Sequence, residues 1–413
     1  MNTRHSAAVI TLLAAAGVPV ANAVIINVPG DEPTIQAGID AAVDGDEVVV
    51  ADGTYIGAGN KNLAFNDRSL TLRSANGPAN CVIDCEDDGR GFFLRNESGT
   101  IIVEGITVTR GRVGAASPGG QRGGAVFCVH VFATFVNCIF DDNHAHVGAG
   151  VYVAETNTCA VFINCQMTNA VFLADGSPDD IHAGAGAYVR SGAIAEFINC
   201  TFADNAVRPN AADHIGGGLH VRIDASVRLA NCVLWGNSAF SGDQIGLTLG
   251  GIVTVQYSDV QGGEAEVVVV DDGTVNWGDG NIDADALFVN PDSGDYRLQA
   301  GSPAIDAGHN WAIAGLTDTD LDGNPRFAAD ENDFDPGCGI PVVVDMGAYE
   351  YQGDPFPVKF GDIDGDGIVG IVDFLALLAD WGSCVEECCL ADLDIDGVVG
   401  VIDFLLLLGN WTA

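Results

Sequence analysis

Four copies of one short motif constrain this chain more than any other feature of its sequence. Each copy places alternating apolar residues before an Asn-Cys pair, and the four pairs begin at Asn137, Asn164, Asn199 and Asn231. Repeats of about 20–50 residues are typical of solenoids, in which every unit packs on its neighbours. The extra residues of the longer units lie at 175–180 and 208–213, which predicts loops that project from a shorter common coil.

The pattern inside each unit predicts short strands. Apolar and polar residues alternate with period two, and glycine-rich strand starts recur between the Asn-Cys pairs at Gly148, Gly184 and Gly216. Three units reach a second asparagine, at positions 143, 205 and 237. Asparagine suits the corners of such coils, because it tolerates a left-handed backbone and its side chain can hydrogen-bond to the next coil. We therefore expect a mainly β chain that folds as a parallel β-helix, with like residues stacked in ladders.

The N-terminal part of the chain fits the same architecture. Residues 34–42 place apolar side chains at helical spacing, and a strand is expected at 47–51. A short helix there would cover the open end of the first coil. Together with 52–55, this stretch resembles the N-terminal cap of secreted right-handed parallel β-helix proteins of the pectate-lyase-like superfamily. The resemblance extends over residues 28–260 and implies a right-handed β-helix with an N-terminal helical cap.

Residues 261–357 resemble a narrower group. The motifs at 280–285, 287–291, 301–308 and 344–350 occur in the order found in the tail of the choice-of-anchor Q family of bacterial surface β-helix proteins. The resemblance implies export and an attachment module at the end of the chain. It implies no reaction.

Two segments 30 residues apart each carry the pattern of a calcium-binding loop. Aspartates stand at positions 1, 3 and 5, glycine makes the turn at position 6, position 7 offers a carbonyl and aspartate closes the shell at position 12. An apolar helix is expected after each loop. The predicted Ca²⁺ ligands are Asp362, Asp364, Asp366, Ile368 and Asp373 in the first loop and Asp392, Asp394, Asp396, Val398 and Asp403 in the second. A third, incomplete loop begins at Asp318 and lacks an acidic residue at position 12.

Residues 358–413 resemble a dockerin, the module that docks into cohesin domains in polysaccharide-degrading assemblies. The resemblance implies two Ca²⁺ ions and a cohesin-like partner. This chain departs from the family at positions 10 and 11 of each loop, which are often small and polar; here they are the apolar pairs Ile371-Val372 and Val401-Ile402. A different or intramolecular partner stays open, and the alternative role for calcium is only to fold a small cap.

The N-terminal segment, the net charge and the cysteine content indicate where the protein is located and which partners it can bind. Arg4, an apolar stretch at 7–18 and Ala21-Asn22-Ala23 predict a signal peptide over residues 1–23, and therefore a secreted or cell-surface protein. We expect no transmembrane segment in the mature chain, because no later apolar run is long enough. The formal net charge of −41 argues against nucleic acid as a partner. Of the 12 cysteines, the four that follow an asparagine leave stacked buried thiols and disulfides both open: Cys138, Cys165, Cys200 and Cys232. A local clamp is expected among Cys384, Cys388 and Cys389.

Polar residues also align between repeats. His146, His182 and His214 each stand two residues before a glycine-rich strand start, which predicts a ladder on one face. Tyr152, Tyr188 and His220 align in the same way, as do Arg190 and Arg222. Such a face could bind a sugar chain, hold a metal or supply an acid and a base. The alternative is that polar residues at a coil corner simply stack.

A basic segment stands out in this acidic chain, between residues 90 and 122. Its arginines are Arg90, Arg95, Arg110, Arg112 and Arg122. Arginine binds carboxylate or sulfate through two hydrogen bonds, so an acidic polysaccharide is a candidate ligand; pairing with acidic neighbours is the alternative. β-helix lyases of this resemblance use calcium with Arg or Lys as the base, and with only Lys61 and Lys359 present an arginine is the expected base.

The sequence thus predicts a secreted or surface calcium-binding protein that binds an extracellular polysaccharide and, as a lyase or glycoside hydrolase, degrades it. The alternative is a non-catalytic surface or adhesion protein whose β-helix serves as a rigid spacer.

Overall fold

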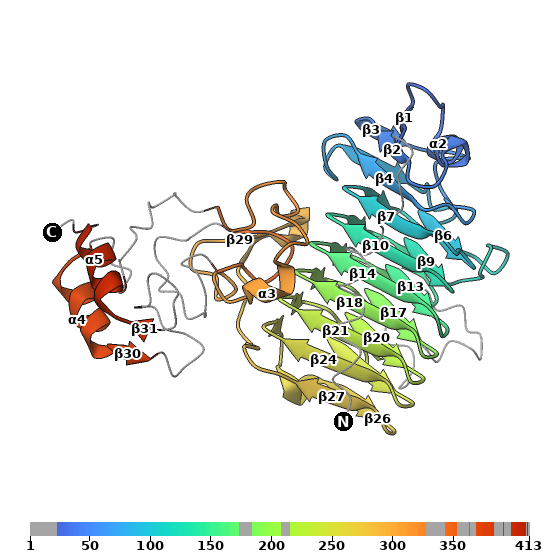
Figure 1. Ribbon diagram of the computed structural model, residues 1–413. Coiled ribbons are helices and arrows are strands. Elements are labelled where there is room, and N and C mark those ends of the chain that lie inside the picture. The colour runs from blue at the N-terminus through green and yellow to red at the C-terminus, as the bar shows by residue number, and fades with distance from the viewer. Residues whose placement is uncertain are drawn as a thin grey trace.

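The computed structural model describes residues 23–172, 184–207, 215–327, 343–352, 363, 369–383, 391, 398–409 and 411. The chain is mainly β, and the strands of successive coils stack into three long parallel sheets (Figure 1). The predicted parallel β-helix is therefore confirmed.

The largest sheet, called sheet A, contains ten strands. In order they are β1 (Ile25–Val28), β2 (Glu47–Val50), β4 (Leu70–Ser74), β7 (Thr100–Glu104), β10 (Phe132–Val136), β14 (Cys159–Ile163), β18 (Ile194–Ile198), β21 (Ser226–Ala230), β24 (Ile252–Gln256) and β27 (Thr274–Trp277).

Sheet B has eight strands, which follow the strands of sheet A around a corner. They are β3 (Gly53–Tyr55), β5 (Cys81–Asp84), β8 (Thr107–Thr109), β11 (Ile139–Asp141), β15 (Gln166–Thr168), β19 (Thr201–Ala203), β22 (Val233–Trp235) and β25 (Asp259–Val260).

Sheet C has seven strands and leads from sheet B back to sheet A. They are β6 (Phe92–Arg95), β9 (Val126–Val129), β13 (Val151–Ala154), β17 (Ala187–Arg190), β20 (Leu219–Arg222), β23 (Ile245–Thr248) and β26 (Val268–Val270). A short parallel pair, β12 (His144–Ala145) and β16 (Val171–Phe172), lies between sheets B and C along the chain.

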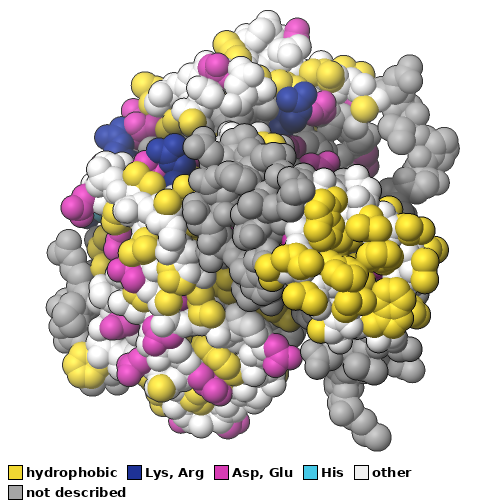
Figure 2. Space-filling view, turned by 90° about the vertical axis from the view of Figure 1, so that its left-hand side faces the viewer, with side chains coloured by type: hydrophobic (Ala, Val, Ile, Leu, Met, Phe, Trp, Pro, Cys, Tyr) yellow, Lys and Arg dark blue, Asp and Glu magenta, His cyan; other side chains and the backbone are white. Residues whose placement is uncertain are grey.

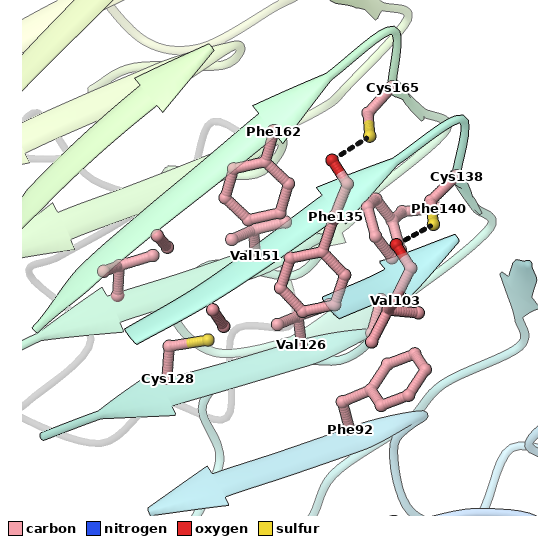
Figure 3. Packing of buried hydrophobic residues seen from close by; sticks show 14 of the residues in the cluster. Phe92, Val103, Val126, Cys128, Phe135, Cys138, Phe140, Val151, Phe162 and Cys165 are labelled. Carbon is pink, nitrogen blue, oxygen red and sulfur yellow. Dashed lines mark hydrogen bonds between the residues drawn. The ribbon is translucent and has the colours of Figure 1, made fainter. Parts of the chain in front are cut away.

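Stacked aromatic rings fill the interior of the coil. Phe135, Phe162 and Phe197 occupy the same register position in neighbouring strands of sheet A. Their ring centroids are 5.0 and 4.9 Å apart, with interplanar angles of 6° and 11°. The thiols that follow the corner asparagines point inward beside these rings, and the Cys165 Sγ donates to the Phe135 carbonyl at 3.5 Å (Figure 3). The eight described cysteines are all buried and free, so for them the stacked-thiol alternative holds.

The asparagine corners behave as the repeat predicts. Asn137, Asn164, Asn199 and Asn231 all adopt positive φ, between 49° and 54°. Their amides bond along the axis: Asn164 Nδ2 donates to Asn137 Oδ1 at 3.1 Å, and Asn231 Nδ2 to Asn199 Oδ1 at 3.0 Å. The coils are thus joined at this corner by side chains as well as by the sheets.

The predicted N-terminal helix is α2 (Ile35–Ala41), which packs on β1 and β2 at the first turn. Thr34 caps it, since Thr34 Oγ1 accepts from the Ala37 amide at 3.2 Å. Gly38 permits the contact, because a Cβ there would lie 2.8 Å from Val28 Cγ2 and 2.9 Å from Val48 Cγ1.

Residues 286–327 and 343–351, here called the tail, return to the outside of the coils. They include the antiparallel pair β28 (Phe288–Asn290) and β29 (Asp295–Leu298) and the helix α3 (Asn310–Ile313). The corner asparagines hold them: Asn164 Nδ2 donates to the Thr319 carbonyl at 2.6 Å, and Asn199 Nδ2 to the Asp345 carbonyl at 2.9 Å. Ile313 and Val344 pack on outward residues of sheet A.

The incomplete third calcium loop lies inside this tail. The Asp320 carboxylate accepts from the amides of Asp322, Asn324 and Glu350 at 2.8–3.0 Å. Arg326 is fully buried nearby and donates to the carbonyls of Asp345 and Gly347. Asp320 therefore organises a turn of the tail, and no group of three metal-binding side chains is present among the described residues.

Near the C-terminus two helices, α4 (Ile371–Ala379) and α5 (Val401–Gly409), pack side by side and form what is here called the C-terminal helix pair. The rings of Phe374 and Phe404 are 5.4 Å apart, and Leu377 and Leu407 are buried between the two repeats. The short strands β30 (Gly382–Ser383) and β31 (Val398–Val399) pair antiparallel.

Asp259 on β25 generates a prediction about pH. Its side chain is fully buried, Oδ1 accepts from the Ala284 amide at 3.2 Å and Oδ2 has no hydrogen-bond partner. Burial raises the pKa of this carboxyl to about 7, and nearby Asp283 and Asp285 add to the shift. The folded protein thus holds a proton that the unfolded chain releases near pH 4, so this group's contribution to stability is lost as pH rises from about 4 to about 7.

Asp259→Asn should remove that loss. Between pH 5 and pH 8, ionisation of Asp259 should lower the free energy of unfolding of the wild type by about 3 kcal/mol. This corresponds to about 1.4 kcal/mol for each pH unit below the raised pKa. Denaturant unfolding of Asp259→Asn and wild type at both pH values checks this, with exposed Asp271→Asn as the control. An equal drop in the wild type and in Asp259→Asn would contradict the prediction.

Candidate functional site

The outer face of sheet C carries a row of rings that runs across five coils. Phe93, Phe127, Tyr152, Tyr188 and His220 are register partners in β6, β9, β13, β17 and β20. They point outward because the residues on either side of them in each strand fill the core of the coil. We call this surface the ladder face.

The rings stack because parallel pairing in register repeats each position from one coil to the next. Centroids are 5.1 Å apart for Phe93 and Phe127, 5.2 Å for Phe127 and Tyr152 and 5.8 Å for Tyr152 and Tyr188. Tyr188 meets the His220 ring edge-on at 5.0 Å. His220 Nε2 lies 3.0 Å from Thr248 Oγ1 on the next strand. The predicted alignment of Tyr152, Tyr188 and His220 is therefore correct.

Three arginines lie beside the part of this row that runs from Tyr152 to His220. Arg190 and Arg222 are register partners, two residues beyond Tyr188 and His220 on the same outward face. The Arg122 guanidinium lies over the Tyr152 ring, 5.9 Å from its centroid. Arg122 is exposed, and Arg190 and Arg222 are half-buried. Among the described residues the ion pairs involve other arginines, such as Arg228 with Glu196, and these three make none.

The ionisation of the tyrosines reflects two opposed effects. Burial raises the pKa of Tyr152, and the charges of Arg122 and Arg190 oppose that shift. Burial likewise raises the pKa of Tyr188, against the positive charge of Arg222, Arg190 and Arg122. Both phenols therefore stay protonated at neutral pH, and the exposed chemistry of the ladder face belongs to the guanidinium groups.

Only one member of the predicted histidine ladder lies among the described residues. His146 is half-buried between β12 and β13, and its ring meets the Phe172 ring edge-on at 6.3 Å. His182 and His214 fall outside the described residues. The weak catalytic candidates that the structure does bring together are Arg190 and Arg222.

The arginines of the basic segment occupy separate positions. Arg110 binds the Asp84 carboxylate through Nε, at 2.8 Å, and through Nη2. Arg112 is exposed, and its backbone bridges to Gly89 and His144. Arg95 is exposed on β6, two residues beyond Phe93 on the outward face of sheet C. Arg90 and Arg122 contact the rings of the ladder face.

Sequence reasoning missed the N-terminal half of this site. Phe93, Phe127 and the arginines beside them were not assigned to the row of Tyr152. The sequence feature that could have revealed Phe127 is the glycine-rich strand start at Gly123. Phe127 follows Gly123 at the same distance at which Tyr152 follows Gly148, and the two rings are register partners.

Most of the predicted calcium ligands fall outside the described residues. They are Asp362, Asp364, Asp366, Ile368, Asp392, Asp394 and Asp396. Asp373 is described and buried, and its two oxygens accept from the amides of Ile363 and Gly370, both at 2.6 Å. Asp403 Oδ2 accepts from the Gly400 amide at 2.7 Å in the same way. Val398 lies in β31. Both aspartates, the last residues of the predicted loops, are thus held in the first turn of a helix.

The C-terminal helix pair carries an apolar surface. Seen from the side on which α4 and α5 lie, hydrophobic side chains gather in one large patch (Figure 2). Its exposed residues match in the two repeats: Ile371 and Val401, Val372 and Ile402, Leu375 and Leu405, Leu378 and Leu408, Trp381 and Trp411. Contiguous apolar patches of more than a few hundred Å² are rare on monomeric proteins and mark interaction sites.

A comparison with protein families agrees with a β-helix. Residues 124–300 match the family described as the right handed beta helix region. No curated protein matches the chain. Among solved structures, pectate lyase Pel9A is similar with a TM-score of 0.38 and 15% identity, over 79% of this chain and 96% of that one. A PL6 family alginate lyase is similar with a TM-score of 0.28 and 13% identity, over 63% of this chain and 39% of that one.

In the part of the chain that the structure describes, none of the helices has the length and hydropathy needed to span a bilayer.

The stacked row predicts a specific stability effect. Tyr152 is 3% exposed between two stacked rings, so Tyr152→Ala should lower the free energy of unfolding by about 3–5 kcal/mol. Tyr152→Phe keeps the ring and should change it by less than about 1 kcal/mol. Guanidinium unfolding measures both, with Phe132→Ala, at a 45% exposed aromatic, as the control. A Tyr152→Ala effect no larger than that of Phe132→Ala would show that the row does not stabilise the coil.

Proposed function

We propose that the protein binds an extracellular acidic polysaccharide along the ladder face. The observation that carries this proposal is the set of three arginines, Arg122, Arg190 and Arg222, which lie beside a buried row of rings and form no ion pair among the described residues. Guanidinium groups bind carboxylate and sulfate through paired hydrogen bonds. Because successive coils repeat at about 4.8 Å, groups on two neighbouring coils can meet one or two sugar units of an extended chain.

The rings of Tyr152, Tyr188 and His220 do not themselves meet the ligand, whereas the Arg122 guanidinium lies over the Tyr152 ring. Tyr152, Tyr188 and His220 are no more than 3% exposed, so a sugar cannot stack on their faces. Their packing removes freedom from the surrounding side chains before binding, which lowers the entropic cost of ordering a flexible guanidinium. The proposed recognition is therefore electrostatic and directional.

Degradation of the bound chain is the further part of the proposal, by lyase or glycoside hydrolase chemistry. In a lyase reaction a half-buried arginine, Arg190 or Arg222, would serve as the base. The burial of the tyrosines and of His220 favours the second candidate, a non-catalytic surface or adhesion protein, because a catalytic acid or base must reach the reacting atoms.

We also propose that residues 358–413 form a dockerin-like module that binds two Ca²⁺ ions and attaches a secreted protein to a cohesin-like partner. The apolar patch of the C-terminal helix pair supports attachment, because it includes Ile371, Val372, Val401 and Ile402 at positions 10 and 11 of the predicted loops. Its apolar character favours a partner whose binding surface is apolar as well.

The polysaccharide proposal is tested with a panel of uronic-acid, sulfated and neutral polysaccharides. Wild type should be retained on the acidic members only. The double variant Arg190→Ala/Arg222→Ala should bind at least tenfold more weakly, because two charge-assisted contacts of about 1.5–3 kcal/mol each are removed. Affinity electrophoresis measures retention, and reducing ends or unsaturated products report degradation.

Arg297→Ala is the matched control, since Arg297 is exposed on the tail and pairs with Asp295. Equal retention of the double variant and this control would remove the ladder face as the binding surface. Retention without products would select the non-catalytic candidate.

The calcium proposal predicts a stability effect. Millimolar Ca²⁺ should raise the melting temperature of the C-terminal module, because a ligand present at 100 times its Kd adds about 2.7 kcal/mol. Asp362→Ala/Asp392→Ala should abolish this shift. Exposed Asp380→Ala, in the same module, should retain it. Calorimetry of the full chain with and without chelator measures the effect, and an unchanged calcium titration in the double variant would refute the loop assignment.

A further inference from the structure

Arg90 is enclosed at the N-terminal end of the ladder face. Its side chain has no solvent exposure, although it carries a guanidinium group. The guanidinium carbon lies 5.2 Å from the Phe93 ring centroid and 5.1 Å from that of Phe127. Nη2 donates to the Gly120 carbonyl at 3.0 Å. Arg90 is thus wedged against the same row of rings that fixes Arg122 beside Tyr152.

The hydrogen-bonding capacity of this guanidinium is not filled. Nε and Nη1 have no hydrogen-bond partner, and no carboxylate among the described residues forms an ion pair with Arg90. Burial lowers the pKa of Arg90 to about 10, so the group still carries its charge at neutral pH. A buried cation without an anion is destabilising, and two ring faces offset only part of that penalty. Within the described residues, this buried cation therefore has no counter-ion.

The cover over Arg90 is a surface segment, Gly114–Gly120, without large side chains. Its hydrogen bonds are local: the Ser117 amide donates to Gly114 O at 3.0 Å and the Gly120 amide to Ser117 O at 2.8 Å. At Gly119 the backbone rests on the site, with φ at +75°. A Cβ there would lie 2.9 Å from Phe127 Cε2 and 3.0 Å from both Arg90 Nη1 and Phe93 Cε2.

We propose that Arg90 is the anchor of an anionic subsite that binds the carboxylate of an acidic sugar when the Gly114–Gly120 segment lifts. This inference rests on the proposed binding of an acidic polysaccharide to the ladder face and adds a subsite at the N-terminal end of that face, beside Phe93 and Phe127. The carboxylate replaces the Gly120 carbonyl on Nη2 and fills the vacant Nε, which gives the side-on, two-bond geometry of arginine and carboxylate. The sugar ring then lies beside Phe93 and Phe127, which the segment now covers.

Two variants of the full chain move the affinity in opposite directions. Arg90→Gln removes the positive charge and the pair of guanidinium N–H donors, and binding of oligogalacturonate should weaken at least tenfold. Gly119→Ala places a methyl group against Phe127 and Arg90, so the segment is displaced, and binding should tighten about three- to tenfold. Neither change should alter binding of the fully methyl-esterified oligomer. Isothermal titration calorimetry measures all four combinations.

A monosaccharide separates this inference from the proposal on which it rests. Free galacturonate should shift the Arg90 Nε–H resonance in wild-type protein, whereas galactose should not, and Arg90→Lys should lose acid selectivity while keeping the charge. A galacturonate response without retention of any acidic polysaccharide would refute the proposed function and would still support the subsite at Arg90. Retention of acidic polysaccharide that is unchanged in Arg90→Gln, Arg90→Lys and Gly119→Ala would overturn the subsite alone.

Discussion

The structure depends on the parallel, in-register stacking of one coil on the next. Stacking repeats each sequence position along the axis, so a favourable side chain at one position stabilises the fold several times over. Inside the coil this repetition yields the row of Phe135, Phe162 and Phe197. Outside, on sheet C, it yields the row from Phe93 to His220. The interior row builds the core, and the outer row fixes the charged side chains around it.

The corner asparagines link the coil to the tail because each has more hydrogen-bonding capacity than the corner itself uses. A left-handed asparagine satisfies one neighbour along the axis and still has groups facing outward. Asn231 shows this most completely: its Nδ2 donates to Asn199 Oδ1 and to the His309 carbonyl, and its Oδ1 accepts from the His309 amide. The tail can therefore lie on this corner without leaving polar groups unsatisfied, which burial of an irregular segment requires.

The sequence predicted those parts of the fold that the repeat encodes directly. Strand period, asparagine corners and inward thiols follow from the spacing, and the register of Tyr152, Tyr188 and His220 follows from their place after the glycine-rich starts. The position of the tail on the coils could not be predicted from the sequence, because its contacts with Asn164 and Asn199 join residues about 150 positions apart. The basic segment was misleading for a related reason. Nearness in sequence placed Arg110 with Arg90 and Arg122. However, Arg110 follows β8 of sheet B and binds Asp84, whereas Arg90 and Arg122 lie against the rings of sheet C.

The same logic explains how an acidic chain presents basic groups on one face. With a formal net charge of −41, isolated surface arginines would find carboxylates and be neutralised, as Arg110 is by Asp84 and Arg297 by Asp295. Arg122 and Arg90 instead lie against rings, which attract a cation without neutralising it. Removing water from such a cation increases its preference for an anion. Within the described part of the chain, the aromatic row thus lies against two guanidinium groups that form no ion pair with a carboxylate, as the proposed binding of an external acidic ligand requires.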